Sequence, residues 1–227
     1  MSLILNIDTS TEKASVSLAS EGRLLESISN ENQKDHAAFL QPAVSELFKN
    51  NGLDIKDLEA VALANGPGSY TGLRVGMASA KGFCYALNKP LITIGTLELM
   101  AASAIAAQNS GPTVFCPMID ARRMEVFTAL YDDKMEVLNP PQAMILDENS
   151  WSVELNQQPI LFLGNGAPKW MAICQHLNAF FTEIDISPAI FSLYSYKQHQ
   201  DKNYTPLAYS EPYYLKAFHT TQKRQAT

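Results

Sequence analysis

The residues with the clearest chemical potential stand in a glycine-rich segment, residues 65–74, which reads Asn-Gly-Pro-Gly-Ser-Tyr-Thr-Gly-Leu-Arg. A short apolar run over 60–64 precedes it and an apolar-periodic stretch over 73–87 follows it, so the pattern predicts a buried strand, a turn and a helix. Such a turn gathers free backbone N–H groups that could bind an anion. Known phosphate motifs do not fit, because Thr71 stands where the Walker A and dinucleotide-binding patterns need a glycine or alanine. The segment is therefore a glycine-rich turn with a chemistry of its own.

The elements that must position this turn fall into two similar halves. In the first half we expect strands and helices over residues 3–7, 14–19, 23–28, 36–50, 60–64, 73–87, 91–94 and 97–108. The second half repeats the opening, with strands expected over 114–119, 124–130 and 135–138. Duplicated three-stranded units with helices are the arrangement of the actin, hexokinase and heat-shock ATPase superfamily (the ASKHA fold). We therefore expect an α/β protein with two lobes, residues 1–108 and a smaller 109–218, a cleft between them, and a flexible tail over 219–227.

Composition places the chain among ordinary globular proteins. It has 227 residues and a mass of 25.0 kDa, with 46% hydrophobic and 18% charged residues, which is enough for a sizeable core. The net charge of −6 argues against autonomous binding to nucleic acid, which needs a basic face. The three cysteines lack disulfide or zinc spacing, the start lacks a signal peptide, and no run approaches the ~20 apolar residues of a membrane span. These features predict a reducing, cytoplasmic setting.

Four segments together resemble the signature of the bacterial TsaB (YeaZ) family. They are the decapeptide, the first strand with its Ile-Asp-Thr-Ser-Thr end, the Ile-Asp-Ala-Arg-Arg-Met-Glu-Val-Phe segment over 119–127, and Glu-Pro-Tyr-Tyr-Leu-Lys over 211–216. They lie in order across nearly the whole chain. The resemblance implies a role in making threonylcarbamoyl-adenosine beside the anticodon of tRNA, as a non-catalytic partner of a larger paralogue, TsaD.

The resemblance also marks Asp8, Thr9 and Ser10 as candidates for a vestigial nucleotide cleft. In the ATP-using members of the superfamily, an aspartate here orients a metal-bound water while hydroxyl and N–H groups contact phosphates. The alternative is a β-turn whose aspartate and hydroxyl side chains cap the local backbone. The sequence leaves both interpretations open.

By symmetry, Asp120 would be the facing carboxylate of such a cleft. An Ala-Arg-Arg segment follows it, in place of the glycines that let a phosphate approach the backbone closely. Arg122 or Arg123 could instead pair with Glu125 or Asp120 in a structural ion pair. This departure argues against ATP hydrolysis by the chain.

Gly164, Asn165 and Gly166 follow a predicted strand and precede a predicted helix. Their position resembles the adenosine loop of the superfamily. A strand-to-helix turn that needs a positive φ would use the same residues, and the sequence favours this second interpretation.

The histidines argue against a metal site. TsaD is known for two histidines four residues apart on its first helix, which bind a catalytic metal. Here His36 begins the matching helix, but Leu40 stands four residues further on, and the other histidines have no partner at ligand spacing. A lone histidine at a helix start is typically solvated or capping. With no nucleophile motif either, we expect no catalytic residue, no metal and no cofactor.

The helix after the decapeptide has a strip of small residues, because Gly72, Gly76, Ala80 and Cys84 recur at every fourth position. A glycine within a helix costs about 1 kcal/mol relative to alanine, which suggests close approach of another helix; packing on the protein's own sheet is the alternative. In the family, this helix and the preceding one are implied to form the contact used for self-pairing and for TsaD binding. The candidate interface residues are Phe39, Ala43, Gly68, Tyr70, Gly72, Leu73, Gly76, Met77 and Ala80.

Three hypotheses for function follow. The first is a non-catalytic scaffold that binds and activates TsaD, forms a homodimer when alone, works beside the ATPase subunit TsaE of the same pathway, and contacts tRNA only indirectly and no membrane. The second is an ATP-using enzyme of the actin-like superfamily. The third is a peptidase, which the missing histidine pair disfavours.

Overall fold

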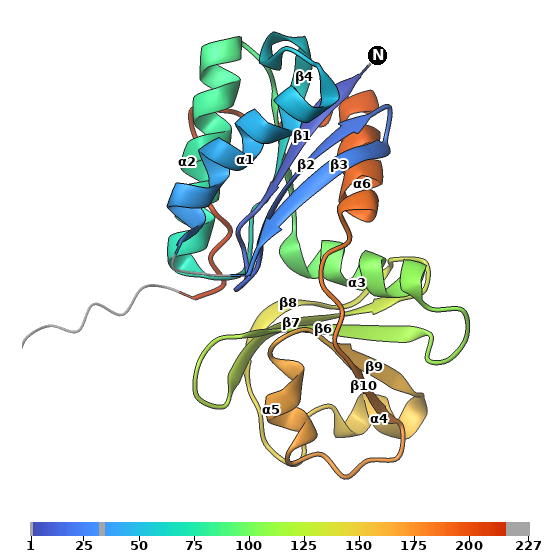
Figure 1. Cartoon of the computed structure of the whole chain (residues 1–227). Coiled ribbons are helices and arrows are strands. Elements are labelled where there is room, and N and C mark those ends of the chain that lie inside the picture. The colour runs from blue at the N-terminus through green and yellow to red at the C-terminus, as the bar shows by residue number, and fades with distance from the viewer. Residues whose placement is uncertain (1, 32–34, 217–227) are drawn as a thin grey trace, which may run out of the picture.

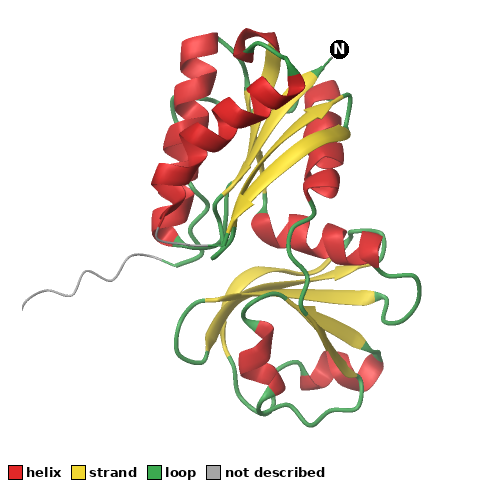
Figure 2. Cartoon of the chain, in the orientation of Figure 1, coloured by secondary structure: helices red, strands yellow, loops and turns green. Residues whose placement is uncertain are grey.

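The chain folds into two α/β lobes, one above the other in the views of Figures 1 and 2. The computed structural model describes residues 2–31 and 35–216. Each lobe is built on a five-stranded mixed sheet, so the predicted two-lobed α/β fold is confirmed. The tail expected over 219–227 lies outside the described residues.

The sheet of the first lobe has the order β3-β2-β1-β4-β5. Its strands are β1 (Leu3–Asp8), β2 (Ala14–Ser20), β3 (Arg23–Asn30), β4 (Leu58–Ala64) and β5 (Leu91–Ile94). β1 is antiparallel to β2 and parallel to β4. Every residue of β1 is buried, which explains why this strand reads as an almost continuous apolar run.

The sheet of the second lobe repeats this arrangement with the order β10-β9-β6-β7-β8. Its strands are β6 (Val114–Asp120), β7 (Glu125–Asp132), β8 (Val137–Ile145), β9 (Ile160–Leu163) and β10 (Ala179–Thr182). β6 is antiparallel to β7 and parallel to β9, as β1 is to β2 and β4. The duplication predicted from the sequence is therefore present in the strand order. β8 is longer than expected, because an edge strand tolerates prolines such as Pro140 and Pro141.

Helices α1 (His36–Asn51) and α2 (Tyr70–Leu87) cover one face of the first sheet. Helix α1 ends at Gly52, whose φ of 63° forms the expected left-handed cap. Two short helices, α4 (Ser152–Gln157) and α5 (Ala167–Met171), belong to the second lobe. Within residues 2–31 and 35–216, no helix combines the length and apolar character needed to cross a bilayer.

Helices α3 (Thr96–Ala107) and α6 (Pro188–Gln200) are exchanged between the lobes. α3 follows the last strand of the first sheet but packs on β6 and β7 of the second, whereas α6 follows β10 and packs on β1, β2, β3 and β5. Phe191 of α6 is buried in the first-lobe core beside Ile4 and Ile92. Each of the predicted lobes, 1–108 and 109–218, therefore contains one helix that packs on the sheet of the other lobe, α3 in the first and α6 in the second. Sequence periodicity missed this helix because its apolar residues form no single stripe.

Candidate functional site

The turn after β1 is closed by contacts within the chain. The Asp8 carboxylate accepts hydrogen bonds from the backbone N–H of Ser10 at 2.9 Å and from its hydroxyl at 2.6 Å, and the Thr9 hydroxyl donates to the carbonyl of Gly72 at 2.7 Å. All three turn residues are buried. Burial raises the pKa of the Asp8 carboxyl, against the opposing effect of the hydrogen bonds from Ser10. The capping turn, one of the two interpretations left open by the sequence, describes these contacts.

The glycines of the decapeptide let α2 lie directly on this turn. A Cβ at Gly68 would overlap the carbonyl of Ser10, and one at Gly72 would overlap that of Thr9. A Cβ at Gly76 would overlap the Thr9 hydroxyl. The strip of small residues therefore allows close packing inside the first lobe, which is the alternative that the sequence analysis gave beside a partner surface.

Six of the nine candidate interface residues are buried. Those buried in the first lobe are Ala43, Gly72, Leu73, Gly76, Met77 and Ala80. Phe39, Gly68 and Tyr70 are partly exposed. Ala43, Met77 and Ala80 belong to the first-lobe core, and Gly72 and Gly76 lie against Thr9. Met77 also lines a surface groove beside Arg74 and Ala78.

The outer face of α2 has a different set of small residues, which the sequence analysis missed. Ala78 and Gly82 are exposed, and a Cβ at Gly82 would meet no atom within 4 Å. Tyr85 beside them is 83% exposed. Gly82 therefore has no packing role within the described part of the chain. The sequence indicated this position only by a glycine in the middle of the predicted helix.

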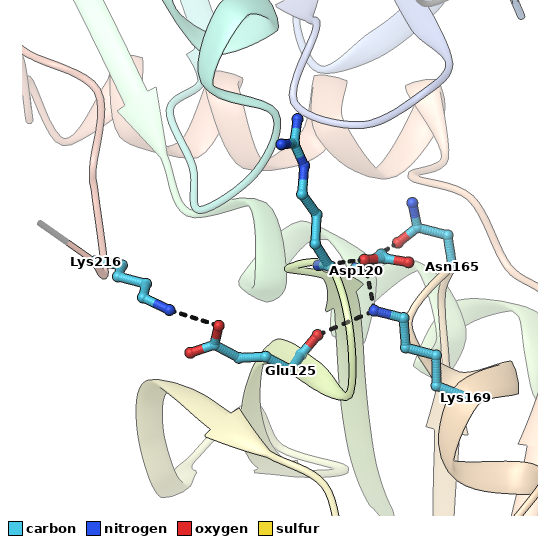
Figure 3. A network of polar contacts seen from close by, with 6 residues as sticks. Asp120, Glu125, Asn165, Lys169 and Lys216 are labelled. Atoms are coloured by element: carbon cyan, nitrogen blue, oxygen red, sulfur yellow. Dashed lines mark hydrogen bonds and ion pairs between the residues drawn. The ribbon is translucent and has the colours of Figure 1, made fainter. Parts of the chain in front are cut away.

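The second carboxylate of the proposed cleft, Asp120, is also engaged within the chain (Figure 3). It accepts hydrogen bonds from the Lys169 ammonium at 2.6 Å and from the backbone N–H of Arg122 at 2.5 Å. Glu125 pairs with Lys216 at 2.6 Å. The acids thus pair with lysines, and the expected ion pairs with the arginines are not formed. Among residues 2–31 and 35–216, the side chains of Arg122 and Arg123 make no hydrogen bond or ion pair.

Close packing requires both glycines of the candidate adenosine loop, Gly164 and Gly166. Gly164 has φ of 92°, and a Cβ there would overlap Met100 and the carbonyl of Met118. Gly166 donates its N–H to the same carbonyl at 3.0 Å. Asn165 accepts a hydrogen bond from the backbone N–H of Asp120 at 2.9 Å. These contacts fit the strand-to-helix turn that the sequence favoured.

His36 is buried, with 3% of its surface exposed, so the expectation of a solvated side chain is wrong. Its Nε2 lies 3.1 Å from the carbonyl of Glu12. Its Nδ1 has no hydrogen-bond partner among the described atoms. Across the described ranges, no three histidine, cysteine, aspartate or glutamate residues are grouped as they would be around a metal ion.

Three of the segments that carry the family resemblance meet around one cavity of about 420 Å³. Its lining comes from the decapeptide, from the β6–β7 hairpin and from the segment that ends the described chain, with residues Pro67, Gly68, Tyr70, Ala121, Arg122, Arg123, Glu125, Phe127, Tyr213, Tyr214, Leu215 and Lys216. The rings of Tyr70 and Tyr214 lie 5.4 Å apart, and Arg74 donates to the Tyr214 hydroxyl at 3.2 Å. This convergence was not predicted from the sequence.

Curated relatives match most or about half of the chain. A family model described as TsaD, tRNA N6-adenosine threonylcarbamoyltransferase, matches residues 24–189. The tRNA threonylcarbamoyladenosine biosynthesis protein TsaB of Bacillus subtilis is 32% identical over 165 residues, covering 71% of this chain and 70% of that protein. The Escherichia coli protein of the same name is 35% identical over 132 residues, covering 56% of this chain and 54% of its own length.

Two solved structures from Pseudomonas aeruginosa have the same fold. One is YeaZ, with a TM-score of 0.79 and 27% identity. The other is described as an uncharacterized protein with similarity to peptidase YeaZ, with a TM-score of 0.82 and 25% identity. Both alignments cover 95% of this chain and 100% of the solved chain.

Proposed function

Because the chain belongs to the TsaB (YeaZ) family, we propose that it is a non-catalytic subunit needed for threonylcarbamoylation of the adenosine beside the anticodon in tRNA. It acts by binding and activating TsaD, beside the ATPase subunit TsaE. Alone it forms a homodimer, and it contacts tRNA only through its partners. A cytoplasmic location follows from this proposed substrate.

The observation that best supports a non-catalytic role is that both cleft carboxylates already have partners within the chain. Asp8 is buried and holds the Ser10 turn, and Asp120 is paired with Lys169. In a phosphoryl-transfer site, such carboxylates must be free to hold a metal or orient a water. The Thr9 and Ser10 hydroxyls are buried as well. This arrangement supports a role in positioning a partner.

The contact surface that we propose is the outer face of α2. Gly82 has open space in front of it, and exposed Ala78 lies one turn earlier on the same face. A glycine in mid-helix costs about 1 kcal/mol relative to alanine, and no contact among the described residues explains Gly82. Two helices approach most closely where small residues face each other. The 83% exposed ring of Tyr85 would supply apolar area to the same contact.

The test is reconstitution of tRNA modification with purified TsaD and TsaE, with and without this chain. Gly82→Leu places a large side chain on the proposed contact, at a position where a Cβ meets no described atom within 4 Å. We expect it to weaken association with TsaD at least about tenfold and to lower threonylcarbamoyl-adenosine formation in parallel, since the coupling between such sites is about 1–3 kcal/mol. Ala189→Leu is the matched control, because Ala189 is exposed on α6, at the opposite face of the sheet.

The outcome decides between surfaces and between hypotheses. Full association and activity of Gly82→Leu would rule out the outer face of α2. An Asp8→Asn protein that folds but forms no modified nucleoside, together with metal-dependent ATP turnover by the isolated chain, would favour the ATP-using enzyme instead.

A further inference from the structure

A second cavity, of about 570 Å³, lies between the two lobes and is called the interlobe cavity below. Its walls come from the β1–β2 turn, from β2 and β3, from the β9–α5 loop, and from the connector of β10 to α6 that joins the lobes in Figure 1. The described lining contains one basic residue, Lys13, and five acidic ones, namely Asp8, Glu12, Glu31, Glu183 and Asp185. Walls of one charge sign raise the local concentration of ions of the opposite sign. The interlobe cavity therefore favours a cation and disfavours a polyphosphate.

Asp8 is the buried member of this acidic set, with 5% of its surface exposed. Both hydrogen bonds from Ser10 reach the same carboxylate oxygen, Oδ1. Among residues 2–31 and 35–216, Oδ2 has no hydrogen-bond donor, although Asp8 lines the interlobe cavity. Burial raises the pKa of the Asp8 carboxyl, and the negative charge of Asp185 adds to that rise. A buried acceptor without a donor is costly, and a cation in the cavity would supply the donor.

Lys13 shows how these walls hold an ammonium group. Its Nζ lies 3.0 Å from a carboxylate oxygen of Asp185 and 3.9 Å from one of Glu31. Glu12 and Glu183 line the same cavity, and neither has an ion-pair partner among the residues that the structure describes. Their carboxylates are therefore available to a further ammonium group.

The neutral part of the lining suits an organic cation. Ser15 and Ser29 are register partners on β2 and β3 and contribute hydroxyl groups to the wall, and a hydroxyl oxygen accepts hydrogen bonds from ammonium groups. Met100, Ile184 and Ile186 add apolar surface, on which a methylene chain can lie as the stem of a lysine does. In the described ranges the carboxylates are not grouped around one point, as the octahedral oxygen ligands of Mg²⁺ would be.

We propose that the interlobe cavity binds a linear aliphatic polyamine such as spermidine. One ammonium group lies at the first-lobe acids, Asp8 and Glu12, and another lies at Glu183 of the connector, with the methylene chain on the apolar wall. The cavity volume falls within the usual range of small-ligand sites. No residue of α2 lines the cavity, so the inference does not depend on the proposed TsaD contact.

The test is isothermal titration of the full chain with spermidine, propylamine and MgCl₂, at about 0.15 M salt to screen the exposed charges. We expect one saturable site for spermidine with a Kd below about 1 mM. Propylamine has a single ammonium group and Mg²⁺ needs a compact ligand set, so each should bind at least about tenfold more weakly. The absence of saturable spermidine binding, or equally tight binding of propylamine or Mg²⁺, overturns the proposal.

A double variant, Glu12→Gln with Glu183→Gln, tests the place of binding. Both residues are exposed and make no ion pair in the described part of the chain, so the variant should unfold at the same temperature as the parent. Its affinity for spermidine should fall at least about tenfold, because two charge-assisted contacts are lost.

The matched control is Glu136→Gln with Glu148→Gln, which removes the same charge from two exposed positions outside the cavity. The control should leave spermidine affinity unchanged. An equal loss of affinity in both double variants would show attraction to the acidic chain as a whole and overturn the site. Unchanged affinity of the Glu12 and Glu183 variant overturns it as well.

Discussion

Two glycines on the same helix should respond in opposite ways to the same substitution. Gly76 and Gly82 both lie within α2, six residues apart, and each would gain one methyl group on replacement by alanine. The new Cβ at Gly76 would overlap the Thr9 hydroxyl and lie 3.0 Å from Leu63 Cδ1, whereas the new Cβ at Gly82 would meet nothing within 4 Å. We expect Gly76→Ala to destabilise the protein and Gly82→Ala to stabilise it.

The magnitudes follow from the contacts. Both variants gain about 0.5–1 kcal/mol of helix stability from the alanine. At Gly76 the buried Thr9 side chain must move, which endangers its 2.7 Å hydrogen bond to the Gly72 carbonyl, a loss of about 0.5–1.5 kcal/mol. Overpacking adds about 1–3 kcal/mol. The net expectation is a loss of about 0.5–4 kcal/mol at Gly76 against a gain of about 0.5–1 kcal/mol at Gly82.

The measurement is urea-induced unfolding of the two variants and the parent chain, followed by circular dichroism at equal protein concentration. Equal slopes would show that stability alone has changed. A Gly76→Ala protein as stable as Gly82→Ala would refute the close packing of α2 on the Thr9–Ser10 turn. It would also reopen the inner strip of α2 as a partner surface.

Two further predictions test the burial of Asp8 and the exchange of α6. Burial raises the folded-state pKa of Asp8, so its contribution to stability should fall as pH rises from about 4, the ordinary aspartate value, through the raised value. Asp8→Asn should flatten that part of the profile of unfolding free energy against pH. An unchanged slope would contradict a raised pKa of the Asp8 carboxyl. Phe191→Ala should cost about 3–5 kcal/mol, because Phe191 is 2% exposed in the first-lobe core. Hydrogen exchange should show reduced protection in β1 and β4. If protection were lost only in β6 and β9, the placement of α6 on the first-lobe sheet would be wrong.

The strands and most helices could be predicted because their signals are local. Two short apolar runs, residues 3–7 and 114–119, are each followed by an aspartate. Each forms the central strand of its sheet. Asn51-Gly52 marked the end of α1 correctly. The Glu21-Gly22 pair also predicted the β2–β3 turn correctly. Both residues have positive φ in the structure.

The site could not be predicted in the same way, because its contacts join segments far apart in the sequence. Periodicity shows that Gly72 and Gly76 share a helix face, but it does not say whether that face meets a sheet or a partner. The answer depends on Thr9, more than sixty residues earlier in the chain. The pairing of Asp120 with Lys169 also joins distant segments, whereas the basic residues next to Asp120 in the sequence are Arg122 and Arg123.

Helix α2 connects the cavity lined by Arg122 and Arg123 with the exposed position of Gly82. α2 begins at Tyr70, beside the pocket of Arg122 and Arg123, and carries Gly82 roughly 18 Å further along its axis. Arg74 and Ala78 lie between them and line a groove that α2 forms with Tyr214. A partner docked along the outer face of α2 would therefore contact Arg74, which donates a hydrogen bond to Tyr214 of the cavity wall. The cavity and the groove on α2 share Tyr214, so a partner on the outer face of α2 would lie next to the cavity wall.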